Sequence, residues 1–321
     1  MKTIGFMISK KKNEKRRALL PSDIEHIRNK EYLYFEENYG VALGIPDEEY
    51  IKSGANMDSR ENILTKDIIC DPKIGDATYL DQLKKNQILF GWIHAVQNKE
   101  LTDFLIENEL TAFAWEDMFE GSRHVFWRNN ELAGEAAILH AFTLYGKLPS
   151  ECKVAILGRG NIARGALKIL GSLGAEITVY DKRTENLLNS ELSNFDVIVN
   201  GVLWDIYRKD HVINKSDLKR MKPESMIIDI SCDESGAIET SKPTTISDPI
   251  YVIDGVIHYV VDHTPTIVYK SVSKSLSKEV CKYIDDFIED KEKQNKVLYD
   301  SLIIEKGKIK DRRINDYQQR K

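Results

Sequence analysis

The stretch VAILGRGNIARGALKILGSLGAEITVYD, residues 154–181, reads as a strand, a glycine turn, a helix and a second strand that ends in an acid. Gly158 predicts the tight turn after the first strand, and Gly160 lets backbone amides approach a pyrophosphate at the start of the helix. Ala163 takes the third position of the motif, where the helix must pack closely on the strand. Asp181 follows about twenty residues later, where a carboxylate would bind the adenosine ribose. This stretch therefore predicts a Rossmann domain that binds a dinucleotide.

The same stretch supplies further candidate cofactor contacts. Asn161 and Ile162 begin the helix, whose first amides we expect at the pyrophosphate. Asp181 favours NADH, because its charge would repel a ribose phosphate. Lys182 and Arg183 could pair with the additional phosphate of NADPH, or they could be a solvated strand end. The cofactor expected from these residues is NAD(P)H, with NADH favoured by Asp181.

Length and composition narrow the class of protein. With 321 residues the chain is long enough for about two domains with separate cores. Its 42% of hydrophobic and 30% of charged residues are typical of a globular protein. The net charge of -5 argues against a nucleic-acid partner, which would favour a basic face. No apolar run approaches the roughly 18 residues of a membrane span, and no secretory signal is evident, so we expect a cytoplasmic protein without a membrane partner.

The cysteines give no sign of a disulfide framework or a metal centre. They lie far apart, and none forms a CxxC pair. No other cluster has the spacing of metal ligands, so no metal is expected.

Short apolar runs alternate with amphipathic stretches along the whole chain, which predicts an α/β fold. A long helix expected over residues 129–150 leads into the domain with the glycine turn, and an amphipathic helix over residues 266–290 returns to the first domain. We therefore expect two Rossmann-like domains with parallel sheets that flank a cleft. The substrate domain would comprise residues 1–130 and 266–321, and the dinucleotide domain residues 131–265. A hairpin is expected around Lys306 and Gly307, and residues 315–321 are expected to be frayed.

Three groups in the first domain could do chemistry. Arg16 and Arg17 follow the first expected strand, Lys73 ends a buried strand, and His94 ends the next one. The carboxyl ends of parallel strands are where open α/β sheets bind ligands. An arginine can bind a carboxylate through two parallel hydrogen bonds, and a histidine can transfer protons near neutral pH. From the residues alone, a solvated basic loop and a structural histidine remain alternatives.

Several segments resemble the alanine dehydrogenase and transhydrogenase family, and they are spread over both domains. The matching segments are NEKRRALLP (13–21), DIICDPKIG (67–75), QILFGWIHAV (87–96) and IIDISCDESGAIETSKPTT (227–245). The resemblance implies that Arg16 holds the substrate carboxylate and that Lys73 binds that carboxylate or the carbonyl oxygen. It also implies that His94 is the catalytic proton carrier, that Asp233 lies beside the nicotinamide, and that the protein forms a homo-oligomer.

Two further segments, HVFWRNNELAG (124–134) and GVLWDIYRKDH (201–211), resemble one branch of that family. Its members condense pyruvate with the side-chain amino group of ornithine or lysine, reduce the resulting imine with hydride, and form an N-(carboxyethyl) amino acid. The resemblance implies NADPH, which disagrees with Asp181. Glu116, Asp117 and Glu120 could receive the cationic groups of such an amine, or they could form an ordinary acidic loop.

Three other functions remain open. The first is an alanine dehydrogenase, which joins pyruvate to ammonia, although His263 stands where those enzymes usually carry Asn. The second is a saccharopine-type dehydrogenase, which uses a larger keto acid. The third is a cofactor-binding sensor without turnover. The presence of all four candidate catalytic residues argues against it, and these are Arg16, Lys73, His94 and Asp233.

Overall fold

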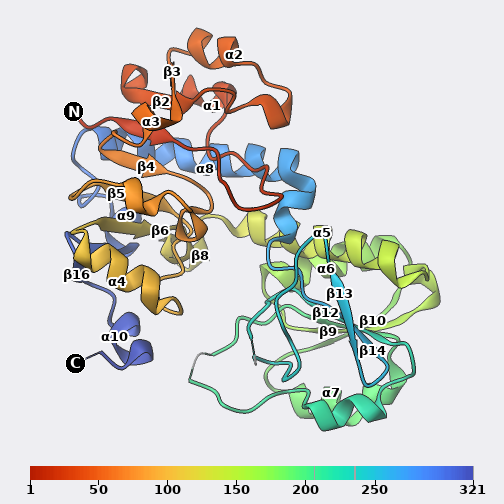
Figure 1. The fold of residues 1–321 in the computed structure, drawn as a ribbon. Coiled ribbons are helices and arrows are strands. Elements are labelled where there is room, and N and C mark those ends of the chain that lie inside the picture. The colour runs from red at the N-terminus through yellow and green to blue at the C-terminus, as the bar shows by residue number, and fades with distance from the viewer. Residues whose placement is uncertain (206, 235, 321) are drawn as a thin grey trace. The chain divides into compact units, whose positions relative to one another are not determined.

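The computed structural model describes residues 1–205, 207–234 and 236–320. The chain forms two compact units, one of Met1–Phe126 with Tyr269–Lys321 and one of Trp127–Val268 (Figure 1). It crosses between them after Phe126 and after Val268, whereas we expected the crossings after residues 130 and 265. No helix in the described part of the chain is long and apolar enough to cross a membrane.

The first unit contains an eight-stranded sheet in the order β16-β15-β6-β5-β4-β1-β2-β3. Strands β1 to β6 run parallel to one another, and β15 pairs with β6 in the antiparallel direction. The central strands β1, β4 and β5 are short apolar runs buried along their whole length, as a parallel sheet covered on both faces requires. The strands are β1 Ile4–Phe6, β2 Leu33–Glu36, β3 Asn56–Asp58, β4 Ile68–Cys70, β5 Ile88–Gly91, β6 Thr111–Ala114, β15 Leu302–Glu305 and β16 Lys308–Ile309.

The strand order of this sheet reverses at β1. The chain passes from β1 to β2 and β3 on one side and then to β4, β5 and β6 on the other. The carboxyl ends of β1 and β4 therefore lie at a topological switch point, where open α/β sheets bind ligands.

Helices surround this sheet, and the returning helix α8 is the longest of them (Figure 1). Phe287 of α8 packs on Phe90 of β5 and Phe113 of β6, with ring centroids 4.8 and 5.0 Å apart. The helices of the unit are α1 Pro21–Ile24, α2 Asp47–Lys52, α3 Arg60–Ile63, α4 Lys99–Glu107, α8 Tyr269–Ile288, α9 Lys296–Asp300 and α10 Arg312–Gln318. A small hairpin is formed by β7 Phe119–Glu120 and β8 Arg123–His124.

Helix α8 also anchors the loop that follows β1. The buried hydroxyl of Ser273 accepts a hydrogen bond from the Arg17 N–H at 2.9 Å, and that of Ser277 accepts one from the Leu20 N–H at 2.8 Å. The Ser277 hydroxyl in turn donates to the Asp23 carboxylate. Residues 17–23 are therefore positioned by a helix that lies some 250 residues later in the chain, as the separations of 256 and 257 residues record.

The second unit contains a six-stranded sheet in the order β10-β9-β11-β12-β14-β13. All neighbours are parallel except the edge strand β13. The order reverses at β9, whose carboxyl end carries the glycine turn. The strands are β9 Lys153–Leu157, β10 Glu176–Tyr180, β11 Val197–Asn200, β12 Met226–Asp229, β13 Ile250–Ile253 and β14 Val256–Tyr259. The helices are α5 Trp127–Tyr145, α6 Asn161–Ser172 and α7 Glu185–Ser190.

The predicted α/β class with two Rossmann-like domains is confirmed, and the hairpin of β15 and β16 forms as expected. The expectation of a frayed end over residues 315–321 is wrong for its greater part, because α10 continues to Gln318. Ile314 is fully buried, and the Gln318 side chain donates to the carbonyls of Ala95 and Val96 at 2.8 and 3.1 Å. These contacts with a distant segment order a sequence that has no apolar repeat of its own.

Candidate active site

The glycine turn of the second unit has the geometry that a dinucleotide needs. Gly158 has φ +118°, which strains any other residue, and a Cβ there would also be crowded by the Gly201 carbonyl at 3.0 Å, so this position favours glycine. Gly160 caps α6, and a Cβ at this position would meet no atom within 4 Å. Open space therefore lies at the N-terminus of a 12-residue helix that begins at Asn161 and Ile162. The residues fit a pyrophosphate at this position.

Asp181 follows β10 at the position expected for the ribose acid. Its carboxylate accepts hydrogen bonds from the Arg183 N–H and from Arg159 Nε, each at 2.9 Å. These bonds lower the pKa of Asp181, so the group is ionised at neutral pH. Arg159, between the two glycines, was missed in the sequence, where a variable position of the motif gives no signal.

Lys182 lines a small cavity of about 70 Å³ at the same edge of the sheet. Leu157 at the end of β9 also lines it, and so do Val202, Trp204 and Arg208 of the segment that follows β11. The Arg208 guanidinium lies over the Trp204 indole, 4.2 Å from the ring centroid. Residues 202–205 and Arg208, from the segment that the sequence singled out, therefore form one wall of this cavity beside the predicted cofactor residues.

Asp233 follows β12, close to a second carboxylate. Asp229 ends that strand, is fully buried and accepts hydrogen bonds from Asn200 Nδ2 at 2.9 Å and the Cys232 N–H at 3.2 Å. Burial and the neighbouring charge of Asp229 raise the pKa of Asp233 to about 6. Asp233 is therefore mostly ionised at pH 7 and takes up a proton in mildly acidic solution.

In the first unit, Arg16, Lys73 and His94 come from the loops after β1, β4 and β5, which are neighbours in the sheet. The loops after β4 and β5 are joined by a hydrogen bond from the Gly75 N–H to the Trp92 carbonyl at 3.0 Å. A Cβ on Gly75 would overlap the Ile93 carbonyl, so this close approach requires glycine. The fold thus brings all three predicted residues to one edge of the sheet.

Arg16 is buried and oriented by Glu14. Its Nε donates to Glu14 Oε1 at 2.8 Å, its Nη2 donates to Oε2 at 2.6 Å, and its guanidinium lies 5.1 Å from the Trp92 ring centroid. Burial alone would raise the pKa of Glu14, but Arg16 outweighs it and the pKa falls to about 2. Arg17 points elsewhere and donates to the carbonyls of Tyr39 and Arg16, so its role is structural.

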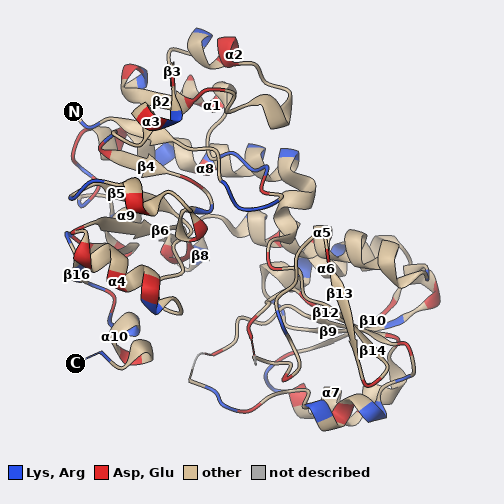
Figure 2. Ribbon diagram, viewed as in Figure 1, with Lys and Arg blue, Asp and Glu red and all other residues tan. Residues whose placement is uncertain are grey.

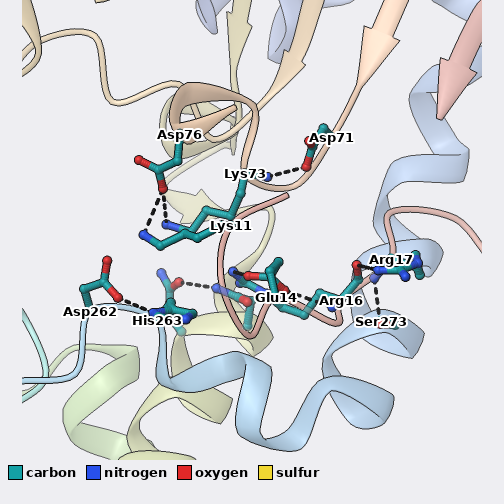
Figure 3. A network of polar contacts seen from close by, with 12 residues as sticks. Lys11, Glu14, Arg16, Arg17, Asp71, Lys73, Asp76, Asp262, His263 and Ser273 are labelled. Carbon is teal, nitrogen blue, oxygen red and sulfur yellow. Dashed lines mark hydrogen bonds and ion pairs between the residues drawn. The ribbon is translucent and has the colours of Figure 1, made fainter. Parts of the chain in front are cut away.

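Lys73 is fixed at both ends. Its backbone N–H donates to Asp71 Oδ1 at 2.8 Å, and its Nζ lies 3.4 Å from Asp76 Oδ2 (Figure 3). Asp71 is fully buried and also accepts from the Tyr79 hydroxyl at 2.8 Å. Burial raises the pKa of Asp71 to about 6. No pattern in the sequence singled out Asp71 or Asp76 beyond their closeness to Lys73.

His94 has a left-handed backbone, with φ +55°, and half of its side chain is exposed. The Glu116 carboxylate accepts from the His94 N–H at 2.5 Å and the Ile93 N–H at 3.2 Å, and its Oε1 lies 4.0 Å from His94 Nδ1. Desolvation lowers the pKa of His94 and nearby Lys73 lowers it further, while Glu116 acts in the opposite direction. The imidazole is therefore neutral at pH 7 and able to accept a proton.

The other residues named from the sequence differ in their surroundings. Glu116 binds backbone amides, Asp117 pairs with Arg313 at 2.7 Å, and Glu120 is exposed on β7. His263 is buried and its Nδ1 contacts the Asp262 carboxylate. Within the residues that the structure describes, no group of His, Cys, Asp and Glu is arranged to bind a metal ion.

Family models match both units of the chain. The alanine dehydrogenase/PNT N-terminal domain matches residues 8–126, and the alanine dehydrogenase/PNT C-terminal domain matches residues 182–312. The NAD binding domain of D-isomer specific 2-hydroxyacid dehydrogenases matches residues 115–235. The chain therefore belongs to the alanine dehydrogenase/PNT family, and it is an NAD(P)-dependent oxidoreductase.

Within the family, the chain is similar to N(5)-(carboxyethyl)ornithine synthases. It is 35% identical to that of Clostridium botulinum over 287 residues, which cover 84% of this chain and 90% of the relative. It is 32% identical to that of Lactococcus lactis, with 84% and 92% covered. Alanine dehydrogenase 1 of Staphylococcus aureus is 26% identical over 300 residues, which cover 81% of each chain.

Two solved structures share the fold. An L-alanine dehydrogenase has a TM-score of 0.85 at 21% identity, covering 99% of both chains. A transhydrogenase from Sinorhizobium meliloti has a TM-score of 0.78 at 18% identity, covering 96% of this chain and 98% of its own.

Proposed function

We propose that this protein catalyses the NAD(P)H-dependent reductive condensation of pyruvate with the side-chain amino group of ornithine or lysine, forming an N-(carboxyethyl) amino acid. The observation that carries the proposal is the similarity to N(5)-(carboxyethyl)ornithine synthases, at 35% identity over 287 residues, against 26% to an alanine dehydrogenase. His263 supports it, because alanine dehydrogenases usually carry Asn at that position. The first unit would be the substrate domain and the second the cofactor domain.

Arg16 and Lys73 would bind pyruvate. Glu14 holds Nε and Nη2 of the guanidinium, which orients Arg16 for a carboxylate. Lys73 would place its ammonium at the carbonyl oxygen, where negative charge develops as the amine attacks the ketone carbon. Asp71 and Asp76 fix the two ends of Lys73, so this charge is in place before the reaction.

His94 would move the protons of the condensation. The neutral imidazole would take one proton from the substrate ammonium, which frees the nitrogen to attack the ketone carbon. A second N–H proton passes to the alkoxide and gives the carbinolamine. His94 would then return the first proton to this hydroxyl, so that water leaves and the cationic iminium remains. NAD(P)H supplies the hydride that reduces the imine. Asp233, ionised above pH 6, would stabilise the cationic iminium or orient a water molecule.

We propose NADH as the favoured cofactor, because Asp181 is placed to bind ribose hydroxyls. Arg159 and Lys182 are the groups that would hold the phosphate of NADPH, and Arg159 lies only 2.9 Å from the Asp181 carboxylate. The two cofactors must therefore be compared directly.

The test is cofactor oxidation, followed by absorbance, with NADH or NADPH, pyruvate, and ammonium, ornithine or lysine. We expect ornithine or lysine to support turnover far better than ammonium. Lys73→Ala serves as the background control and should lose nearly all turnover while still binding cofactor. Turnover with ammonium alone would make the protein an alanine dehydrogenase, and unchanged activity of Lys73→Ala would remove Lys73 from the mechanism.

A further inference from the structure

The loop after β1 is rich in lysine and arginine (Figure 2), and one of its lysines lies at the proposed active site. Lys11 Nζ donates to Asp76 Oδ2 at 2.9 Å, and Lys73 Nζ lies 3.4 Å from the same oxygen. Figure 3 shows both lysine side chains directed at this carboxylate. Asp76 thus links Lys11, which the proposed mechanism does not use, to Lys73, which it does.

Asp76 differs from the other carboxylates near Lys73 and His94. Glu14 and Asp71 are fully buried, and each is already bound on both oxygens. Both oxygens of Glu116 accept backbone hydrogen bonds. The Asp76 side chain is 40% exposed, and its Oδ1 accepts no hydrogen bond within the described residues. This oxygen is therefore available to a cationic ligand.

We propose that Lys11 and Asp76 bind the α-amino acid head group of the amine substrate. The α-carboxylate would bind Lys11 Nζ, and the α-ammonium would donate to Asp76 Oδ1. Each charged group of the ligand would then face a side chain of opposite charge. Because Lys73 contacts the same carboxylate, the head group would lie beside the lysine that holds pyruvate, and the methylene chain would carry the reacting amine to the carbonyl. The inference rests on the proposed function, and it explains how an amino acid is preferred to ammonia.

The experiment compares three amines that differ only in the head group. Ornithine has both charged groups, δ-aminovalerate lacks the α-ammonium, and putrescine lacks the carboxylate. In the wild type, each truncated amine should have a kcat/KM at least about tenfold below that of ornithine, the usual effect of one lost charged hydrogen bond. In Asp76→Asn any loss that acts through Lys73 is common to all three amines, so we expect kcat/KM for ornithine to fall about tenfold further than kcat/KM for δ-aminovalerate. Lys11→Met should reduce kcat/KM for ornithine and for δ-aminovalerate, which carry the carboxylate, and should leave kcat/KM for putrescine unchanged.

Lys10→Met is the matched control, because Lys10 is an exposed neighbour of Lys11. In this variant kcat/KM for each of the three amines should stay within about twofold of the wild type. Equal losses for all three amines in Asp76→Asn would mean that Asp76 acts only through Lys73 and would overturn the proposal. The proposal would also be overturned if both variants kept the wild-type ratios of kcat/KM between ornithine and the two truncated amines. If the wild type does not use ornithine or lysine at all, the proposed function itself fails, and this is seen before any variant is made.

Discussion

At the scale of single residues, the candidate catalytic groups depend on carboxylates that fix them. His94 has a left-handed backbone conformation that is uncommon outside glycine, and Glu116 holds it through two consecutive amides. Glu116 is therefore a positioning residue for His94, a role that differs from the substrate contact considered from the sequence.

Glu116→Gln should remove a negative charge beside His94 and weaken the hydrogen bonds that hold its backbone. Glu116 raises the pKa of His94, so removing its charge favours the neutral imidazole and should lower that pKa further. NMR titration of the ring, assigned with His94→Gln, measures this shift. We also expect kcat to fall, because an amide side chain offers only one oxygen to the two N–H groups.

Glu120→Gln is the control, because Glu120 is exposed on β7 and should leave the pKa of His94 and kcat unchanged. A rise in the pKa of His94 in Glu116→Gln would contradict this account of Glu116.

The sequence singled out Arg16, Lys73 and His94 as candidates but not the carboxylates that contact them. Runs of apolar residues predicted the strands, so the polar residues at the strand ends could be placed at one edge of a sheet. Glu14, Asp71 and Asp76 were not singled out, and Glu116 was considered only as a substrate contact or as part of an acidic loop. Their contacts depend on how loops from different strands fold onto one another, which the sequence does not show. The family resemblance pointed to Arg16 alone, and the structure gives the two arginines different contacts, Arg16 with Glu14 and Arg17 with backbone carbonyls.

At the scale of elements, α5 and α6 approach each other through glycines. A Cβ on Gly165 of α6 would overlap the Glu131 carbonyl of α5, and a Cβ on Gly134 of α5 would overlap the Ile162 carbonyl. The sequence predicted both helices from their apolar spacing. It missed β3 (Asn56–Asp58), a half-buried strand with a polar residue at each end that is ordered by pairing with β2.

Gly165→Ala should destabilise the second unit by about 1–3 kcal/mol, because the added methyl group forces the two helices apart. The matched control is Gly171→Ala in the same helix, where a Cβ would lie 4.0 Å from Ile177 Cδ1, its nearest contact. This second change should be neutral or stabilising by up to about 1 kcal/mol, since alanine is the better helix former. Urea unfolding followed by circular dichroism measures both, and equal stabilities would refute the packing role of Gly165.

At the scale of the whole molecule, the chain builds two doubly wound sheets and passes between them twice. The glycine turn predicted one of these units directly. The other was predicted from alternating strands and helices and from the resemblance to a family, because its switch point has no comparable motif.

The division into units predicts how the cofactor affects unfolding. A nicotinamide cofactor at about 100 times its Kd should stabilise the native protein by about 2.7 kcal/mol and raise its melting temperature. Gly160→Val should melt like the wild type without cofactor, because its Cβ meets nothing within 4 Å and its φ of -72° suits any residue. Its side chain would occupy the space for the pyrophosphate, so cofactor should no longer raise the melting temperature. An undiminished rise, measured by scanning calorimetry, would place the pyrophosphate elsewhere.

The serine contacts of α8 have a consequence for the order in which the protein becomes complete. On the ribosome, residues 17–20 are made long before Ser273 and Ser277. The hydroxyls of these serines accept the hydrogen bonds from the Arg17 and Leu20 N–H groups. All strands and helices of the unit Trp127–Val268 are translated before α8. A growing chain therefore contains every element of the second unit while the segment around Arg16, proposed to bind the substrate, still lacks its anchors on α8.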